Sequence, residues 1–203
     1  TLTMLTERFS IDYGILHTCT LDSMGHRFGH DCHEMDHACY AMDGMLAAFL
    51  PRWLKNGYEV IVTADHGHMN SRGVAIENYP KITECLKRGL SLEPRAVNFF
   101  VKEEKKQQFE EEFRKNFSDT FLLLTKEEVR EKHLFGPGKE GAAFDGMLGD
   151  YLAAAVSDLS IYSHKKEADF FIGVHAGLLE DEMVIPLLLI GSREAMSSDE
   201  ICE

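Results

Sequence analysis

A short β-branched run, residues 58–63 (YEVIVT), ends directly on the polar turn of residues 64–67 (ADHG). The run has the length and composition of a buried strand, so Asp65 and His66 are expected just past its carboxyl end. Residues 13–20 (YGILHTCT) also have the pattern of a buried strand and lead into a second polar turn. Open α/β sheets place their sites at the carboxyl ends of strands. The pattern therefore predicts an α/β fold with a site at that end of the sheet.

The rest of the chain alternates between strand and helix patterns. Apolar side chains at helical spacing predict a helix that stops at Asn56-Gly57, with a kink or restart at Pro51. A further helix is predicted through residues 147–156, and strands at 160–163 and 184–190. This alternation favours a mostly parallel sheet flanked by helices. The first helix is marked by Met42, Leu46, Phe49 and Trp53.

Residues 94–135 carry a strand, helix, strand and helix pattern of their own. One helix is marked by phenylalanines four residues apart, and the next by the capping-box spacing of Thr125 and Glu128. A Gly-Pro-Gly turn closes the stretch. We therefore predict a small α/β insert, a cap-like lobe, within a metal-binding α/β core formed by residues 1–93 and 136–203.

The charge of the chain excludes several classes of partner. It carries 21 Lys+Arg against 34 Asp+Glu, a formal net charge of -13. Such a chain repels phosphate backbones and anionic lipids, so neither nucleic-acid coating nor a membrane-surface role is expected. The apolar run 183–190 is far shorter than the roughly 20 residues of a membrane span.

The number and spacing of the cysteines bear on the cellular compartment of the protein. There are five, an odd number, and no CxxC pair, which favours reduced thiols and a cytoplasmic protein. A signal segment upstream of Thr1 would change that expectation.

Acids and histidines recur in three segments, each placed after a predicted strand. Aspartate and neutral histidine offer the oxygen and nitrogen donors that suit Zn²⁺ or Mn²⁺, and neighbouring glycines let the backbone turn tightly around an ion. One Asp-x-x-x-His pair alone would be weak evidence, but three such segments together favour a metal site. The candidate ligands are Asp22, His26, Asp65, His66 and His175.

Other histidines stand close to these candidates in sequence. His68 follows His66 by two residues and is a candidate for lining the substrate pocket; supporting a ligand from behind or facing solvent are equally open interpretations. His30, Cys32, His33 and His37 lack zinc-finger spacing and are expected on a helix surface or behind the ligands.

The order and spacing of the three motifs resemble a known family. Residues 22–29 (DSMGHRFG), Asp65-His66-Gly67 after a hydrophobic strand, and residues 173–187 (GVHAGLLEDEMVIPL) are similar to the alkaline phosphatase superfamily, in its nucleotide pyrophosphatase/type I phosphodiesterase branch. The resemblance implies an alkaline-phosphatase-like fold and two divalent metal ions, zinc or manganese. It places Asp22, His26 and His175 on one ion, and Asp65 and His66 on the other.

The family's nucleophile has no counterpart in the sequence. The resemblance implies a Thr or Ser on the helix after the first strand, together with a further metal-binding Asp, and both are expected upstream of Thr1. Thr18, Thr20 and Ser23 do not occupy the helix-start position that this nucleophile needs. The chain is therefore expected to supply most of the metal ligands but not the nucleophile, and to be inactive without the upstream segment.

The function implied by the resemblance is hydrolysis of phosphodiester or nucleotide pyrophosphate bonds in a small phosphate-ester substrate. Two divalent ions would make the site locally positive despite the acidic chain. One alternative within the superfamily is a phosphomonoesterase, phosphonate hydrolase or phosphosugar mutase. Another is a catalytically silent domain that binds metal and phosphorylated ligands.

Overall fold

The computed structural model describes residues 11–191, which fall into two units. Of these residues, the first unit takes 11–24, 31–65 and 185–191, and the second takes 25–30 and 66–184. The ends of the predicted core, residues 1–10 and 192–203 with Cys202, lie outside the described residues.

The first unit contains a long helix and a two-stranded ladder. Helix α3 (His33–Lys55) contacts β1 (Val60–Thr63), which pairs antiparallel with β10 (Leu187–Ile190). The predicted helix and strand are thus confirmed. The predicted apolar stripe of α3 is buried or half-buried, and the residues between its members are exposed except for Leu50, which is also half-buried. Helix α3 continues through Pro51 and ends at Asn56, before Gly57 at φ +83°.

The predicted strand at residues 13–20 is wrong. Residues 13–19 have no regular secondary structure, and helix α2 (Thr20–Phe28) begins at the last residue of the run. Tyr13 and Ile15 are 81% and 74% exposed. A strand needs a hydrogen-bonded neighbour, and within residues 11–191 no segment pairs with this run.

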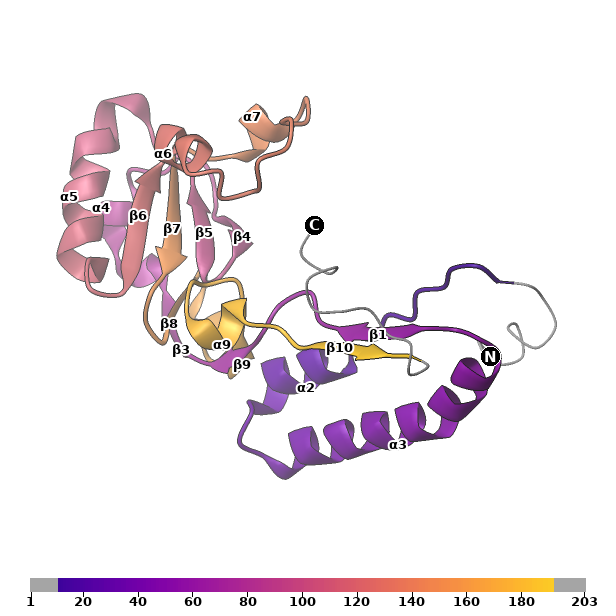
Figure 1. Cartoon of the computed structure of the whole chain (residues 1–203). Coiled ribbons are helices and arrows are strands. Elements are labelled where there is room, and N and C mark those ends of the chain that lie inside the picture. The colour runs from indigo at the N-terminus through magenta and orange to yellow at the C-terminus, as the bar shows by residue number, and fades with distance from the viewer. Residues whose placement is uncertain (1–10, 192–203) are drawn as a thin grey trace. The chain divides into compact units, whose positions relative to one another are not determined.

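The second unit is built around a four-stranded sheet. Its order is β4 (Ser91–Glu93), β5 (Ala96–Phe99), β7 (Tyr151–Ala155), β6 (Phe121–Thr125), and each strand is antiparallel to its neighbours (Figure 1). Helix α5 (Lys106–Phe117) follows β5 and buries the predicted phenylalanine stripe in the core beside this sheet.

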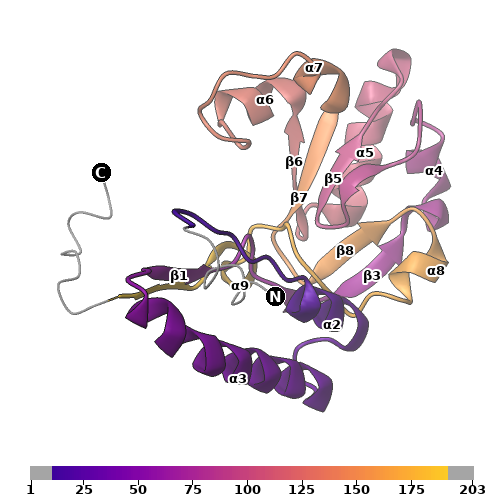
Figure 2. The same ribbon diagram turned by 90° about the vertical axis from the view of Figure 1, so that its right-hand side faces the viewer.

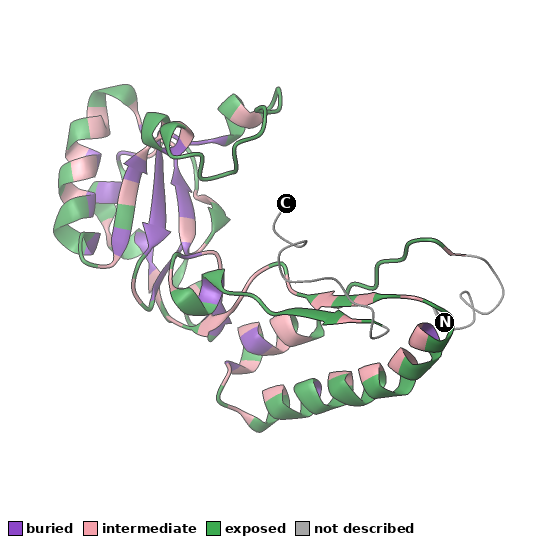
Figure 3. Ribbon diagram, in the orientation of Figure 1, coloured by how far each residue is buried: buried purple, intermediate pink, exposed green. Residues whose placement is uncertain are grey.

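The predicted helix at residues 147–156 is wrong in the same region. Residues 151–155 (YLAAA) form β7, which is buried at every position (Figure 3). Alanine favours helices, but β7 lies between two other strands, where small side chains fit close to their neighbours. Packing therefore overrides local propensity.

The sheets are mixed and the mostly parallel arrangement is not confirmed. Among the described residues, the parallel pairing is that of β3 (Arg72–Ala75) with β8 (Leu159–Tyr162). Strand β2 (Met69–Asn70) pairs antiparallel with β9 (Gly173–Val174). Strands β5 and β6 do run in the same direction, as a βαβ pattern predicts, but β7 lies between them and is antiparallel to both.

The segment predicted as an insert, residues 94–135, contributes β5, α5, β6 and α6 (Lys126–Glu131). Thr125 Oγ1 accepts from Glu128 N and Thr125 N donates to Glu128 Oε2, so the predicted capping box is present. The insert itself stays a prediction, since β4 and β7 of the same sheet lie outside its bounds. The remaining short elements are η1 (Ile76–Asn78), α4 (Pro80–Thr83), η2 (Glu103–Lys105), α7 (Phe144–Met147), α8 (Lys165–Ala168) and α9 (Glu180–Met183).

In the described part of the chain, no helix combines the length and apolar character needed to cross a membrane.

Helix α8 lies beside β3 and β8 (Figure 2) and is tied to η1 by Glu77. Glu77 Oε2 lies 2.9 Å from His164 Nδ1, and Glu77 Oε1 accepts from Lys165 N at 2.7 Å. The hydrogen bond to Glu77 raises the pKa of His164. The bonds from His164 and from the Lys165 backbone lower the pKa of Glu77.

We expect Glu77→Gln to lower the pKa of His164 toward its ordinary value of 6.5. The contribution of His164 to stability is complete below pH 6.5 and is lost as pH rises through its raised pKa. That of Glu77 is complete above pH 4.5 and is lost as pH falls through its lowered pKa. The pair is exposed, so its effect on stability is small, and NMR titration of the His164 Cε1 proton is the suitable measurement. An unchanged pKa would contradict the expectation.

Candidate metal centre

Helix α2 carries two of the predicted ligands. Asp22 and His26 are four residues apart, which places them on the same face of a continuous helix. The boundary between the two units falls inside α2, after Met24. The helix itself therefore sets the spacing of Asp22 and His26.

His26 is anchored in the second unit by a backbone carbonyl. Its Nδ1 lies 2.8 Å from the carbonyl oxygen of Gly173 in β9. A carbonyl oxygen only accepts hydrogen bonds, so Nδ1 carries the proton and the lone pair of the neutral ring is on Nε2. Histidines that bind metals usually donate their other N–H in this way. The edge of the Phe171 ring also packs against His26, with ring centroids 5.4 Å apart.

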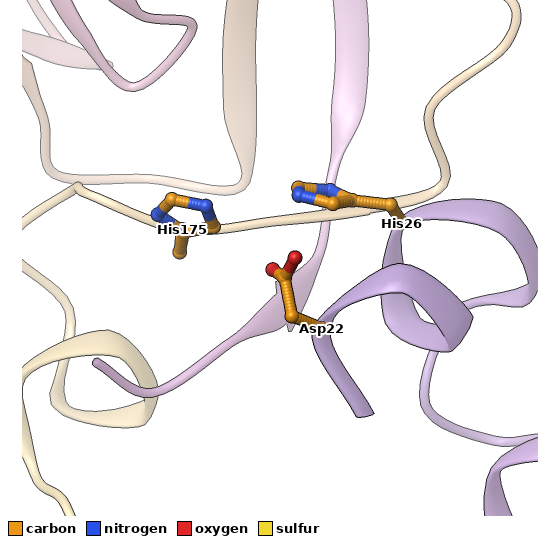
Figure 4. Close-up of side chains that lie close together, drawn as sticks. All are labelled: Asp22, His26 and His175. Carbon is orange, nitrogen blue, oxygen red and sulfur yellow. The ribbon is translucent and has the colours of Figure 1, made fainter. Parts of the chain in front are cut away.

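His175 follows β9 directly. Asp22, His26 and His175 each offer a ligand atom, and these atoms lie within 4.8 Å of one another. Figure 4 shows the carboxylate and the two imidazoles facing a common point. One carboxylate with two imidazoles is a donor set found in catalytic zinc sites that keep an open position. The three side chains therefore fit a divalent ion of the zinc type.

His66, like His26, has its Nδ1 against a backbone carbonyl oxygen. Its Nδ1 lies 2.8 Å from the carbonyl oxygen of Gly67, which again places the neutral lone pair on Nε2. The His66 ring stacks on His175, with centroids 3.7 Å apart and planes 16° apart. Among the described residues, the group with metal-binding spacing contains neither Asp65 nor His66. Their assignment to a second ion stays a prediction.

His68 lies among the histidines of the second unit. Its ring centroid is 4.8 Å from that of His26, 5.6 Å from that of His175 and 6.4 Å from that of His66. Burial, and then the charges of the neighbouring imidazoles, lower the pKa of His68 to about 3. The ring is therefore neutral at physiological pH.

His30, which the sequence analysis expected on a helix surface or behind the ligands, also belongs to this cluster and lies beside His68. Its Nε2 lies 2.9 Å from His68 Nδ1. The spacing of four residues from His26 is compatible with a helix, but α2 ends at Phe28 and Gly29 has φ +78°. The left-handed turn at Gly29 places His30 beside His68, and no motif spacing indicates such a turn.

A buried ion pair holds the turn after His175. Arg95 and Glu182 have fully buried side chains, joined by Nε to Oε1 at 2.5 Å and Nη2 to Oε2 at 2.6 Å. Glu182 Oε1 also accepts from Gly177 N at 2.7 Å. Between His175 and Gly177, Ala176 has φ +79°, a conformation that costs about 1–2 kcal/mol for a residue with a side chain. The ion pair stabilises this turn.

The glycine of the Asp65-His66-Gly67 motif allows two backbone segments to approach closely. Gly67 N donates to Glu182 O at 2.8 Å. A Cβ at Gly67 would collide with the backbone carbonyl of Asp181. The motif therefore needs glycine there for packing against α9.

The structure is that of an α/β protein in which predicted Asp and His ligands gather beside β9. The chain belongs to the type I phosphodiesterase/nucleotide pyrophosphatase family, whose model matches residues 1–177. The nucleotide pyrophosphatase branch of the alkaline phosphatase superfamily, expected from the motifs, is thereby confirmed.

Solved structures show the same fold. Human ectonucleotide pyrophosphatase/phosphodiesterase 5 is 20% identical, with a TM-score of 0.60 over 84% of this chain and 45% of that one. The murine protein is 19% identical, with a TM-score of 0.60 over 84% and 44%. An inactive murine form in complex with AMP is 20% identical, with a TM-score of 0.57 over 84% and 44%. The chain thus spans less than half the length of these proteins. No curated protein matched it.

Proposed function

We propose that the chain supplies metal ligands to a hydrolase that cleaves phosphodiester or nucleotide pyrophosphate bonds. The observation that carries the proposal is the contact of His26 Nδ1 and of His66 Nδ1 with a backbone carbonyl oxygen, each at 2.8 Å. Backbone carbonyls hold Nδ1–H of both His26 and His66, which leaves Nε2 of each neutral ring as a donor for an ion.

The residues divide between two ions. Asp22, His26 and His175 hold one, as their spacing and donor types support. Asp65 and His66 hold the other, which follows from the family resemblance. Bound divalent ions, zinc or manganese, offset the negative charge of the phosphoryl group and lower the pKa of an attacking hydroxyl.

The nucleophile is not assigned to a residue of this chain. Thr20 does begin a helix, but that helix is α2, which carries Asp22 and His26. Thr18 and Thr20 are exposed, and their hydroxyl oxygens lie 2.9 Å apart.

The proposed substrate is a small phosphate ester, with nucleotides as the favoured class. The support is the inactive murine neighbour, whose structure contains AMP. A monoester, phosphonate or phosphosugar substrate is the alternative within the superfamily.

Metal analysis combined with two chromogenic substrates tests this proposal. We expect a version extended upstream of Thr1 to hold two bound ions after dialysis against Zn²⁺ or Mn²⁺, and to cleave a bis-aryl phosphate diester faster than an aryl monoester. The present chain is expected to bind metal without turnover. Faster monoester cleavage by the extended version would favour the phosphomonoesterase alternative, and bound metal without turnover in the extended version would favour the silent domain. Failure to bind any divalent ion would overturn the proposal.

A further inference from the structure

The imidazole of His68 fills a gap between α2 and β9 in the second unit. A Cβ built on Gly25 of α2 would lie 2.9 Å from His68 Cε1 and 3.1 Å from His68 Nδ1. A Cβ built on Gly173 of β9 would lie 2.5 Å from Gly25 O and 2.8 Å from His68 Cε1. The ring occupies the space that a side chain at Gly25 would need, and it shares with the Gly25 backbone the space beside Gly173.

The two glycines stand beside the predicted ligands of one ion. Gly25 precedes His26 directly, and Gly173 precedes His175 by two residues. The bond from His26 Nδ1 to Gly173 O joins the same two elements at 2.8 Å. The His68 ring therefore packs against both backbone segments that carry His26 and His175, beside their direct contact.

A chain of hydrogen bonds fixes the His68 ring in its plane. His68 Nδ1 lies 2.9 Å from His30 Nε2, and His30 N donates to Asn70 Oδ1 at 2.9 Å. Asn70 of β2 is paired in register with Gly173 of β9. These contacts therefore link His68, through His30 and Asn70, to β9, the strand against which its ring packs.

We propose that His68, held by His30, is a positioning residue that sets the spacing and orientation of His26 and His175. This role differs from the lining of a substrate pocket, which its sequence position also allowed. It rests on the proposed function, because the spacing matters for an ion bound by these two rings. His68 acts through its shape and its bond to His30, and does not itself bind the ion.

Co²⁺ binding to the full chain tests whether His68 affects the metal site. We expect His68→Ala to weaken Co²⁺ binding about 10–100-fold, as loss of a supporting partner does at other metal sites, and to change the visible absorption bands that report coordination geometry. His30→Ala leaves the ring in place and is expected to change both in the same direction by a smaller factor. His37→Ala, an exposed histidine of α3, is the matched control and should change neither.

The combination of a larger residue at position 25 with a smaller one at position 68, in the metal-free protein, tests the packing of His68 independently of metal binding. Gly25→Ala is expected to lower the midpoint of thermal unfolding when His68 is present. It should not lower the midpoint in the His68→Ala background, because the three nearest side-chain atoms to the added Cβ all belong to His68. Equal effects of Gly25→Ala in the two backgrounds would overturn the packing on which the proposal rests.

The two measurements separate the possible failures. If the unaltered chain binds Co²⁺ and His68→Ala leaves both affinity and spectrum unchanged, the positioning role is wrong while the metal site stands. If the unaltered chain binds no Co²⁺, the proposed function fails and the positioning role fails with it.

Discussion

Replacement of Arg95 by Met is expected to lower the free energy of unfolding by about 3–5 kcal/mol. The substitution leaves the Glu182 carboxylate without its guanidinium partner in a site where both side chains are 0% exposed. It also removes the bonds that Arg95 donates to the carbonyl oxygens of Leu159 and Ser157, at 2.9 and 2.8 Å. A buried charge that loses its partner is among the costliest changes that a single substitution can make.

Urea unfolding followed by circular dichroism measures this loss. The double variant Arg95→Met/Glu182→Leu is expected to recover much of it, because apolar residues of similar size can replace a buried ion pair. Arg72→Met is the matched control. It breaks the Arg72–Asp158 pair, whose side chains are 71% and 50% exposed, and should change the free energy of unfolding only slightly because solvent screens the pair. A similar, small loss for Arg95→Met and Arg72→Met would contradict the account of the buried pair.

His26→Ala is expected to weaken Zn²⁺ binding at its site by a factor of at least about 100. Loss of a supporting residue behind a ligand already costs about 10–100-fold, and this substitution removes the ligand itself. It also removes the hydrogen bond to Gly173, which holds α2 against β9. Competition with a chromophoric chelator measures the affinity, with the unaltered chain and His37→Ala as references.

The number of zinc ions that stay bound in His26→Ala shows whether the two proposed sites are independent. Asp65 and His66 are proposed to hold a separate ion, so His26→Ala is expected to leave one equivalent of tightly bound zinc. Loss of both equivalents would show that the two sites bind as a unit, and retention of both would show that His26 is not a ligand.

Sequence reasoning worked best where a residue's role depends on close neighbours in the chain. The capping box at Thr125 and the end of α3 at Asn56 follow from local backbone chemistry, and both are present. In both cases the contacting groups are a few residues apart. Asp22 and His26 lie on one face of α2, whereas the sequence analysis expected a polar turn at these residues.

Sequence reasoning failed where the secondary structure of a segment depends on residues that are distant in the chain. Residues 151–155 favour a helix by composition, yet they form the buried strand β7 because β5 and β6 flank them. Residues 13–19 have an apolar composition typical of a strand, but no partner strand is present among residues 11–191. Sequence alone does not supply these neighbours.

In the histidine cluster, some members follow from short motifs, and others depend on contacts between residues that are distant in the chain. The motif identified His26, His66 and His175, whereas the participation of His30 depends on the turn at Gly29 and on the bond to His68. The buried partner of Glu182 is 87 residues away in the chain, at Arg95, and no spacing rule connects the two.

The strand order β4-β5-β7-β6 has a consequence for the course of folding. Strand β7 is the last of the four in the chain, yet it supplies hydrogen bonds to both β5 and β6. During synthesis, β5 and β6 leave the ribosome before the strand that joins them. A nascent chain that ends at Asp150 therefore lacks the middle of its sheet, and the edges of β5 and β6 that β7 would join stay unpaired. Such a chain is prone to aggregation until β7 emerges.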